Sequence, residues 1–341
     1  MEKVNWGIIG LGRIAEVFSN AFEEAENAQL LAVASREQKK LNHFKNHFNL
    51  ESKFLFDNYE DLISCDDIDI VYIALPNSLH HQWIIECIKN KKNILVEKPA
   101  TLTFAEAIDI KRNLDNKNLF FGEAFMYRYL PQMNLVINTI KNKEIGNLIS
   151  METSFGMNLL TKKKFFLFNK KKKIDYMERK FNKNLGGGCI FDLGCYSSSF
   201  SLLIASLIDN HNINNLELIN IQNEMGETGV DIDSYAEILF ENGFKSKIQS
   251  SFKRNLGNQS TITGDKGSLI INDTWKGNRI IKKIDNYNEE LELNTFKNIY
   301  THQIIQISKN IINNENRPNF PGMNLDETIL NSKIIEKWAY A

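Results

Sequence analysis

Residues 4–15 read Val-Asn-Trp-Gly-Ile-Ile-Gly-Leu-Gly-Arg-Ile-Ala, and this stretch decides the fold of the first part of the chain. The apolar run over residues 4–9 predicts a strand, and the spacing of apolar residues after it predicts a helix. Gly10, Gly12 and Ala15 hold the three positions of a dinucleotide-binding turn, which permit a tight bend, close approach to a pyrophosphate and close helix packing. A glycine turn without a ligand is the alternative. The predicted cofactor contacts of this turn are Gly10, Gly12, Arg13 and Ile14.

Short apolar runs alternate with helical periodicity as far as residue 122, which is typical of a parallel sheet covered by helices on both faces. Thr103 and Glu106 have the spacing of a capping box at the start of one of these helices. The other predicted strands cover residues 30–34, 68–75, 93–96 and 119–121. We therefore expect residues 1–122 to form an α/β domain with a doubly wound, Rossmann-type parallel sheet.

The pattern changes after Gly122. Two strand-like runs flank Asn242-Gly243, a strong hairpin signal, and residues 149–155 alternate as a strand does. These features predict an α+β domain over residues 123–341, built on a large, mainly antiparallel open sheet with helices on one face. The helices expected there begin at Pro131, Thr301 and Leu325, and the last one can pack back on the first domain.

Composition excludes several classes of protein. The 41 Lys and Arg residues balance 42 Asp and Glu residues, so the chain has no strong field for nucleic acid or an anionic membrane. No apolar run reaches the length of ~20 residues that spans a bilayer. The four cysteines form no C-x-x-C pair, so neither a metal site nor a disulfide framework is expected. We expect a cytoplasmic protein with no nucleic-acid partner, no membrane partner and no metal.

The end of the second predicted strand indicates which dinucleotide is bound. An acidic residue there would bind the ribose hydroxyls of NAD, but the sequence reads Ala34-Ser35-Arg36. Ser35 and Arg36 instead offer donors for a 2′-phosphate, which favours NADP over NAD. The alternative is that Arg36 only begins a solvated helix.

Five further segments accompany the glycine turn in a fixed order. They are Ala74-Leu-Pro-Asn-Ser-Leu-His80, Glu97-Lys-Pro99, Glu123-Ala-Phe-Met-Tyr-Arg128, Gly186-Gly-Gly-Cys-Ile-Phe-Asp-Leu-Gly-Cys-Tyr196 and the run from Asp233 to Gly243. Together they resemble the glucose-fructose oxidoreductase, inositol dehydrogenase and MocA family over nearly the whole chain. Within that family they are most similar to the NADP-dependent branch of dihydrodiol and D-xylose dehydrogenases.

The resemblance implies that Lys98 lies beside the nicotinamide and the reacting oxygen, that Glu97 lies near the nicotinamide ribose, and that a cis bond precedes Pro99. A solvated lysine at a strand end is the alternative for Lys98, but the carboxyl ends of parallel strands are where open α/β sheets bind ligands. The other cofactor contacts that the resemblance implies are Leu75, Pro76, Asn77 and His80.

The resemblance also makes Asp192 and Tyr196 active-site residues, and their spacing of four places them on one helix face. Many relatives have His where this chain has Tyr196. A tyrosine with its ordinary pKa near 10 needs a shift of about three units to exchange protons at neutral pH, and an ammonium within ~4 Å can supply it. Lys98 is the candidate. Arg128 and Arg179 match family positions and are candidate substrate contacts, with salt bridges as the alternative.

Residues 161–183 contain ten Lys or Arg and two acidic residues. A solvated loop is the simple interpretation, although a basic rim beside the substrate entrance would suit a phosphorylated or nucleotide-linked sugar.

The implied activity is hydride transfer between NADP and a carbinol or hemiacetal carbon of a sugar or cyclic diol, with Lys98, Tyr196 and Asp192 as catalytic residues. One alternative is a ketoreductase acting on a nucleotide-linked keto-sugar in polysaccharide synthesis, and another is a dinucleotide-sensing protein without turnover. Relatives commonly pair through the sheet of the second domain, which binds substrate and mediates oligomerisation, so we expect a homodimer or a dimer of dimers.

Overall fold

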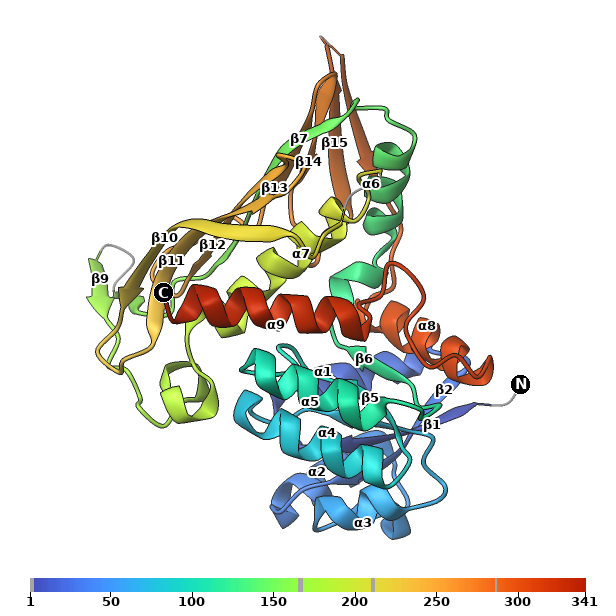
Figure 1. Cartoon of the computed structure of the whole chain (residues 1–341). Coiled ribbons are helices and arrows are strands. Elements are labelled where there is room, and N and C mark those ends of the chain that lie inside the picture. The colour runs from blue at the N-terminus through green and yellow to red at the C-terminus, as the bar shows by residue number, and fades with distance from the viewer. Residues whose placement is uncertain (1–2, 165–167, 210–211, 286) are drawn as a thin grey trace. The chain divides into compact units, whose positions relative to one another are not determined.

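The computed structural model describes residues 3–164, 168–209, 212–285 and 287–341 (Figure 1). The chain divides into two compact units. Unit 1 contains residues 1–129 and 296–329, and unit 2 contains residues 130–295 and 330–341. The sequence analysis placed the division at residue 122, with a last helix that can pack back on the first domain, and the compact units divide after Tyr129, with a return to unit 1 over Phe296–Ile329.

Unit 1 is a six-stranded parallel sheet in the order β3-β2-β1-β4-β5-β6, which confirms the predicted Rossmann topology. Its strands are β1 (Val4–Ile9), β2 (Ala28–Ala34), β3 (Leu55–Phe56), β4 (Ile70–Ile73), β5 (Asn93–Val96) and β6 (Phe121–Glu123). Its helices are α1 (Arg13–Ser19), α2 (Gln38–Phe48), α3 (Tyr59–Ser64), α4 (His80–Lys89), α5 (Phe104–Leu114) and α8 (Tyr300–Ile312). The Thr103–Glu106 capping box at the start of α5 is present.

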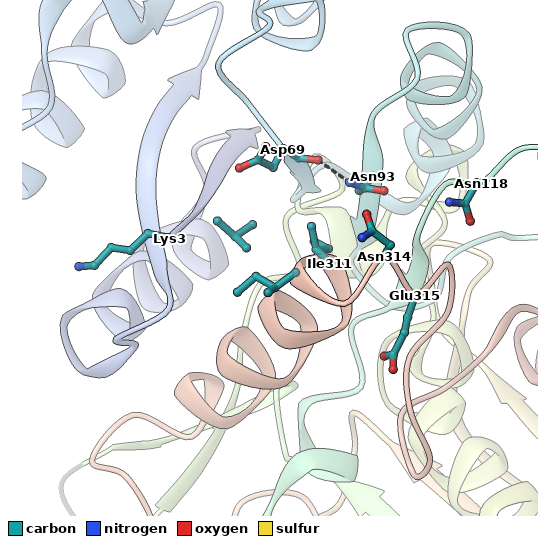
Figure 2. Close-up of a pocket in the computed structure, with 9 residues that line it drawn as sticks. Lys3, Asp69, Asn93, Asn118, Ile311, Asn314 and Glu315 are labelled. Carbon is teal, nitrogen blue, oxygen red and sulfur yellow. Dashed lines mark hydrogen bonds between the residues drawn. The ribbon is translucent and has the colours of Figure 1, made fainter. Parts of the chain in front are cut away.

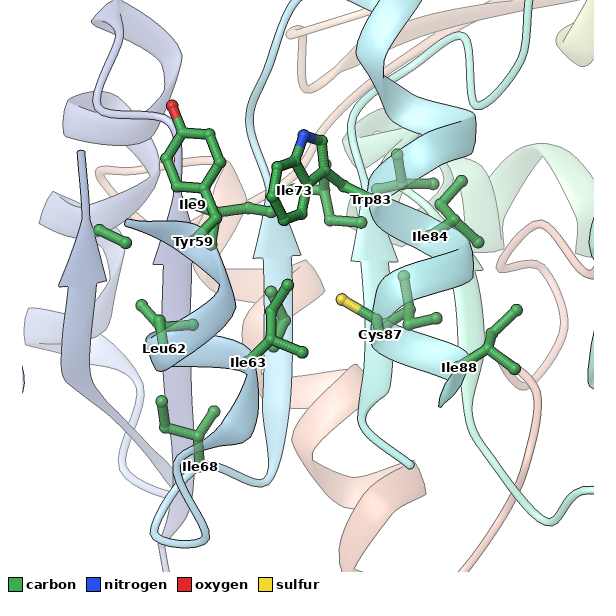
Figure 3. Close-up of a cluster of buried hydrophobic side chains, with 14 of the residues drawn as sticks. Ile9, Tyr59, Leu62, Ile63, Ile68, Ile73, Trp83, Ile84, Cys87 and Ile88 are labelled. Carbon is green, nitrogen blue, oxygen red and sulfur yellow. The ribbon is translucent and has the colours of Figure 1, made fainter. Parts of the chain in front are cut away.

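Side chains along each strand alternate between the two faces of this sheet, so apolar side chains lie on both faces, and helices cover both. On one face Ile9 and Ile73 join a large apolar cluster under α3 and α4, to which Trp83 also belongs (Figure 3). On the other face Tyr72 stacks on Phe18 at 4.0 Å between ring centroids.

Helix α8 belongs to the second of these faces, and this explains why the chain returns to unit 1. The ring of Tyr300 lies 5.9 Å from that of Phe18. The indole N–H of Trp6 donates to Ser308 Oγ at 3.0 Å. A local sequence pattern identifies α8 as a helix but contains no information on which sheet it will cover.

Unit 2 is an eight-stranded mixed sheet in the order β10-β11-β12-β7-β13-β14-β15-β16. Neighbouring strands are antiparallel except β12 and β7, which confirms the prediction of a mainly antiparallel sheet. Its strands are β7 (Leu148–Gly156), β10 (Leu216–Met225), β11 (Asp231–Phe240), β12 (Lys245–Ser251), β13 (Ser260–Gly264), β14 (Gly267–Ile271), β15 (Arg279–Ile284) and β16 (Tyr287–Glu292), with β8 (Thr161–Lys164) and β9 (Phe168–Lys171) forming a separate pair. The helices are α6 (Pro131–Lys141), α7 (Cys195–Ala205) and α9 (Leu325–Ala339), and the division between the units falls within α9.

Helix α7 is the core helix of unit 2. Every residue of α7 is buried, and it packs against β7 and β12. Within the described residues, one helical stretch is long and apolar enough to span a membrane, Lys183–Ala205, and its apolar part is buried inside the fold. Such burial is the ordinary property of a core helix.

Candidate active site

The glycine turn after β1 has the geometry that a pyrophosphate needs. Gly10 has a φ of +90°, and a Cβ there would lie 2.6 Å from the carbonyl oxygen of Ala74, so no other residue fits. Gly12 caps α1, and no heavy atom lies within 4 Å of where its Cβ would be. Ala15 is fully buried at the third position. The open space beside Gly12 lets a ligand reach the backbone, so the turn fits the expected cofactor.

The end of β2 presents Arg36 to solvent. Its guanidinium carbon lies 5.2 Å above the ring centroid of Tyr59, while the buried Ser35 hydroxyl accepts the backbone N–H of Glu37 at 3.1 Å. The sequence interpretation overlooked the carboxylate of Glu37, one residue after Arg36. That carboxylate accepts from Lys40 Nζ at 2.5 Å, so its charge is compensated locally. Arg36 itself is exposed above the Tyr59 ring, and a planar guanidinium in such a place can donate to a phosphate.

The loops after β4 and β5 are joined by His80. Its two ring nitrogens lie 2.8 Å from the carbonyl oxygen of Pro99 and 2.9 Å from that of Leu75, and the side chain is fully buried. Asn77 is buried in the same loop. The Lys98-Pro99 peptide bond is cis, as expected. A single imidazole thus connects two of the predicted cofactor-binding segments.

Lys98 is the second residue after the carboxyl end of β5 and is partly buried. The preceding Glu97 is buried, and its carboxylate accepts from the hydroxyl of Tyr72 at 2.5 Å and from the backbone N–H of Lys98 at 3.2 Å. These bonds hold Glu97 against the sheet. The backbone of Lys98 is therefore fixed at the edge where ligands of this fold bind.

Glu123 is a buried acid that the sequence interpretation did not single out. It ends β6, and its carboxylate accepts from the backbone N–H of Ala100 at 2.9 Å and from the hydroxyl of Thr328 at 2.8 Å. Burial raises the pKa of Glu123 to about 7, against the opposing effects of these two bonds and of Arg128. Glu123 thus supports the backbone two residues after Lys98.

Arg128 forms a buried ion pair within unit 1. Its NH1 donates to Glu327 Oε1 at 2.9 Å and to the carbonyl oxygen of Pro321 at 3.2 Å, and its side chain has no exposed surface. These contacts favour the salt-bridge alternative over a substrate contact, because the guanidinium is already engaged inside the fold.

Asp192 and Tyr196 lie in unit 2 at the start of its core helix. Asp192 is in a π-helical turn, Ile190–Gly194, and Tyr196 is the second residue of α7. The rings of Phe155 and Trp275 lie 5.2 Å and 5.3 Å from that of Tyr196. Single π turns frequently occur at functional sites. Two aromatic neighbours fix the Tyr196 ring, and neither was identified from the sequence.

Asp192 and Arg179, both predicted site residues, are in direct contact. Arg179 NH2 donates to Asp192 Oδ1 at 2.8 Å, and Lys180 Nζ lies 3.6 Å from Oδ2. Asp192 is almost fully buried, while the side chains of Arg179 and Lys180 are 34% and 27% exposed. Two cationic side chains thus lie beside the Asp192 carboxylate. Arg179 and Lys180 come from the Lys-rich segment 161–183, of which residues 165–167 lie outside the described residues.

The two groups of predicted catalytic residues belong to different units, with Lys98 in unit 1 and Asp192 and Tyr196 in unit 2. The pairing of Lys98 with Tyr196 therefore stays a prediction.

A polar hollow of about 430 Å³ opens elsewhere on unit 1, at the amino ends of β1, β4 and β5 (Figure 2). It is lined by Lys3, Asp69, Asn93 and Glu315 among others, and Asn93 Nδ2 donates to the carbonyl oxygen of Asp69 at 2.8 Å. This is the edge opposite the glycine turn, so the hollow is not the candidate active site. Across the described ranges, no group of three potential metal ligands gathers at one place.

Comparison with known proteins agrees with this geometry. Residues 4–125 match the family profile described as "Oxidoreductase family, NAD-binding Rossmann fold", and residues 134–270 match the "GFO/IDH/MocA C-terminal domain". The chain therefore belongs to the GFO/IDH/MocA family of oxidoreductases. Its amino-terminal unit is the NAD(P)-binding Rossmann domain of that family.

Dehydrogenases and reductases are among the similar proteins. The trans-1,2-dihydrobenzene-1,2-diol dehydrogenase of Xenopus tropicalis is 29% identical over 280 residues, which cover 81% of this chain and 78% of that one. Two solved structures share the fold at 20% identity. One is an aldose-aldose oxidoreductase from Caulobacter crescentus complexed with glycerol, with a TM-score of 0.84 over 99% of this chain and 98% of that one. The other is KijD10, a 3-ketoreductase from Actinomadura kijaniata in complex with NADP and TDP-benzene, with a TM-score of 0.80 over 98% and 96%.

Proposed function

We propose that this protein is an NADP-dependent oxidoreductase that moves a hydride between the nicotinamide and a carbinol or hemiacetal carbon of a sugar or cyclic diol. The observation that carries the proposal is the fixed position of Lys98 at the carboxyl end of β5, on the same sheet edge as the glycine turn. Similarity to a dihydrodiol dehydrogenase supports the substrate class. The exposed guanidinium of Arg36, beside the buried Ser35, supports NADP as the preferred cofactor over NAD.

In this proposal the chain's own residues bind, orient and move a proton. NADP, when bound, supplies the hydride acceptor or donor. Tyr196 exchanges the proton of the substrate hydroxyl, and the ammonium of Lys98 lowers the pKa of that phenol and polarises the reacting oxygen. Asp192 accepts a hydrogen bond from a neighbouring substrate hydroxyl, while the bond from Arg179 holds the Asp192 carboxylate in position.

The setting of the enzyme is part of the same proposal. Its partner is a small sugar or diol, with no nucleic acid and no membrane, and it works in the cytoplasm as a homodimer or a dimer of dimers. The near-zero net charge supports the absence of polyanionic partners.

The proposal is tested by following NADPH and NADH with a panel of free sugars, cyclic diols, their keto forms and nucleotide-linked sugars. We expect turnover of a sugar or diol with the NADP pair and much weaker turnover with the NAD pair. Equal use of both cofactors would reject the role of Arg36. Cofactor binding without turnover of any panel member would instead favour a sensor.

A second candidate is reduction of a nucleotide-linked keto-sugar. The specific observation in its favour is that Arg179 and Lys180, two partly exposed cations, lie beside Asp192, where they suit an anionic substrate. The solved complex of a 3-ketoreductase with TDP-benzene belongs to the same fold. The two candidates differ in their response to Lys180→Gln, which should raise KM for a nucleotide sugar and leave KM for a free sugar or diol unchanged.

A further inference from the structure

The helix that carries Asp192 and Tyr196 starts from a backbone held on two sides. On one side the backbone N–H of Gly188 donates to the carbonyl oxygen of Lys180 at 2.9 Å. A Cβ on Gly187 would lie 2.7 Å from that same oxygen, so glycine permits the close approach. This side connects the helix start to the segment that supplies Arg179.

On the other side lies Asp231, the first residue of β11. Its Oδ2 accepts the backbone N–H of Ile190 at 2.7 Å. Gly188 has a φ of +119°, and a Cβ there would lie 2.3 Å from Asp231 Oδ1. The carboxylate of Asp231 thus occupies the space that the Cβ of any other residue at position 188 would need. This explains why position 188 is a glycine.

Asp231 is a buried acid that faces the positive end of a helix. Its side chain is buried, and burial raises its pKa, while hydrogen bonds from the Cys189 side chain and the Ile190 N–H oppose that shift. Two residues after Ile190, the backbone N–H of Asp192 donates to the carbonyl oxygen of Gly188 at 3.1 Å. The turn that Asp231 holds is therefore the turn from which Asp192 emerges.

We propose that Asp231 is a positioning residue: its carboxylate fixes the turn Gly188–Ile190 and thereby sets the direction of Asp192 and Tyr196 at the start of the core helix. In this proposal Asp231 acts through the backbone of the turn and not on the substrate or the cofactor. The catalytic consequence rests on the proposed function, but the anchoring itself does not.

The test compares Asp231→Ala and Asp231→Asn with Asp233→Asn. Asp233 lies two residues along the same strand and pairs with Arg254 through two bonds of 2.8 Å on the surface, so it provides the same change away from the helix start. Amide hydrogen exchange over residues 188–196 is measured first. We expect exchange to speed up by about tenfold to a hundredfold in Asp231→Ala, with a smaller effect in Asp231→Asn, which keeps one neutral acceptor. Asp233→Asn should leave this segment unchanged.

Turnover with the panel's best substrate is measured in the same variants. The expected result is a kcat that falls in the order wild type, Asn, Ala, with an unchanged Kd for NADPH because the glycine turn lies in unit 1. Exchange at residues 188–196 that matches the Asp233→Asn control in both variants would overturn the proposal. If wild type turns over no substrate, the proposed function fails while the exchange result still decides the anchoring.

A measurement on wild type covers the case in which the Asp231 variants do not fold. The amide of Ile190 should exchange as slowly as those of the following helix. Exchange as fast as in the exposed residues 175–177 would contradict the anchor.

Discussion

Replacing Glu123 with Gln should make the protein progressively more stable than wild type as the pH rises. Burial holds the pKa of Glu123 at about 7, against an ordinary value of 4.5. Between these values the folded chain keeps a proton that the unfolded chain has lost, so wild type loses stability as the pH rises through this window. The difference corresponds to about 3 kcal/mol once Glu123 is fully ionised in the fold.

A glutamine avoids this loss because it cannot ionise, and its amide still meets both neighbours. The oxygen can accept from Ala100, and the NH₂ group can donate to the Thr328 hydroxyl, which then turns to accept. We expect the stability of Glu123→Gln relative to wild type to increase by about 2 to 3 kcal/mol between pH 5 and pH 8.

The assay is urea unfolding of both proteins at several pH values across this range, with the difference in midpoint plotted against pH. Glu86→Gln makes the same chemical change at a partly exposed position of α4, where the carboxylate pairs with Lys89, and serves as the control. The midpoint of Glu123→Gln minus that of wild type should increase with pH. A difference that stays constant or decreases would refute the claim that Glu123 keeps its proton up to near neutral pH.

Four further outcomes are expected. Arg36→Ala should weaken NADP binding by about 1.5 to 3 kcal/mol in titrations and leave NAD binding nearly unchanged; equal losses would remove Arg36 from the phosphate site. Arg128→Met should lower the free energy of unfolding, measured with urea, by about 3 to 5 kcal/mol, because it leaves the buried Glu327 without this partner. A loss below about 1 kcal/mol would contradict the ion pair. Thr328→Val should raise the pKa of Glu123 further, so that the pH-dependent loss of stability extends to higher pH in the same assay. Light scattering at micromolar concentration should give a dimer or a tetramer, and a stable monomer would count against the proposed assembly.

Local patterns in the sequence were enough to predict most of unit 1. The strand over residues 93–96 and the capping box at Thr103 appear where they were expected. Such features depend on residues close together in the chain, which is why a sequence pattern identifies them. The short β3 and α3 were not predicted, because a two-residue strand and a six-residue helix are too short to show a period.

Long-range pairing accounts for what the sequence did not reveal. The parallel contact between β7 and β12 joins strands about a hundred residues apart, and no local signal specifies such a partner. The same holds for the site: Arg128 reads as a candidate substrate contact until Glu327, from the other end of the chain, is seen beside it. Asp231 carried no motif at all, and its role follows only from its contact with Ile190.

The most direct test of the proposed chemistry is the rate of hydride transfer in Tyr196→Phe, Lys98→Met and the double variant, with the Kd for NADPH measured on the same samples. The proposal predicts that each single change lowers turnover by about 10²–10⁴, that Tyr196→Phe binds NADPH as wild type does, and that the double variant is little worse than either single one. Lys98→Met should also move the remaining pH optimum upward, because the phenol loses the charge that lowers its pKa. Near-normal turnover in Tyr196→Phe would contradict the proposal and leave Lys98 as the proton carrier.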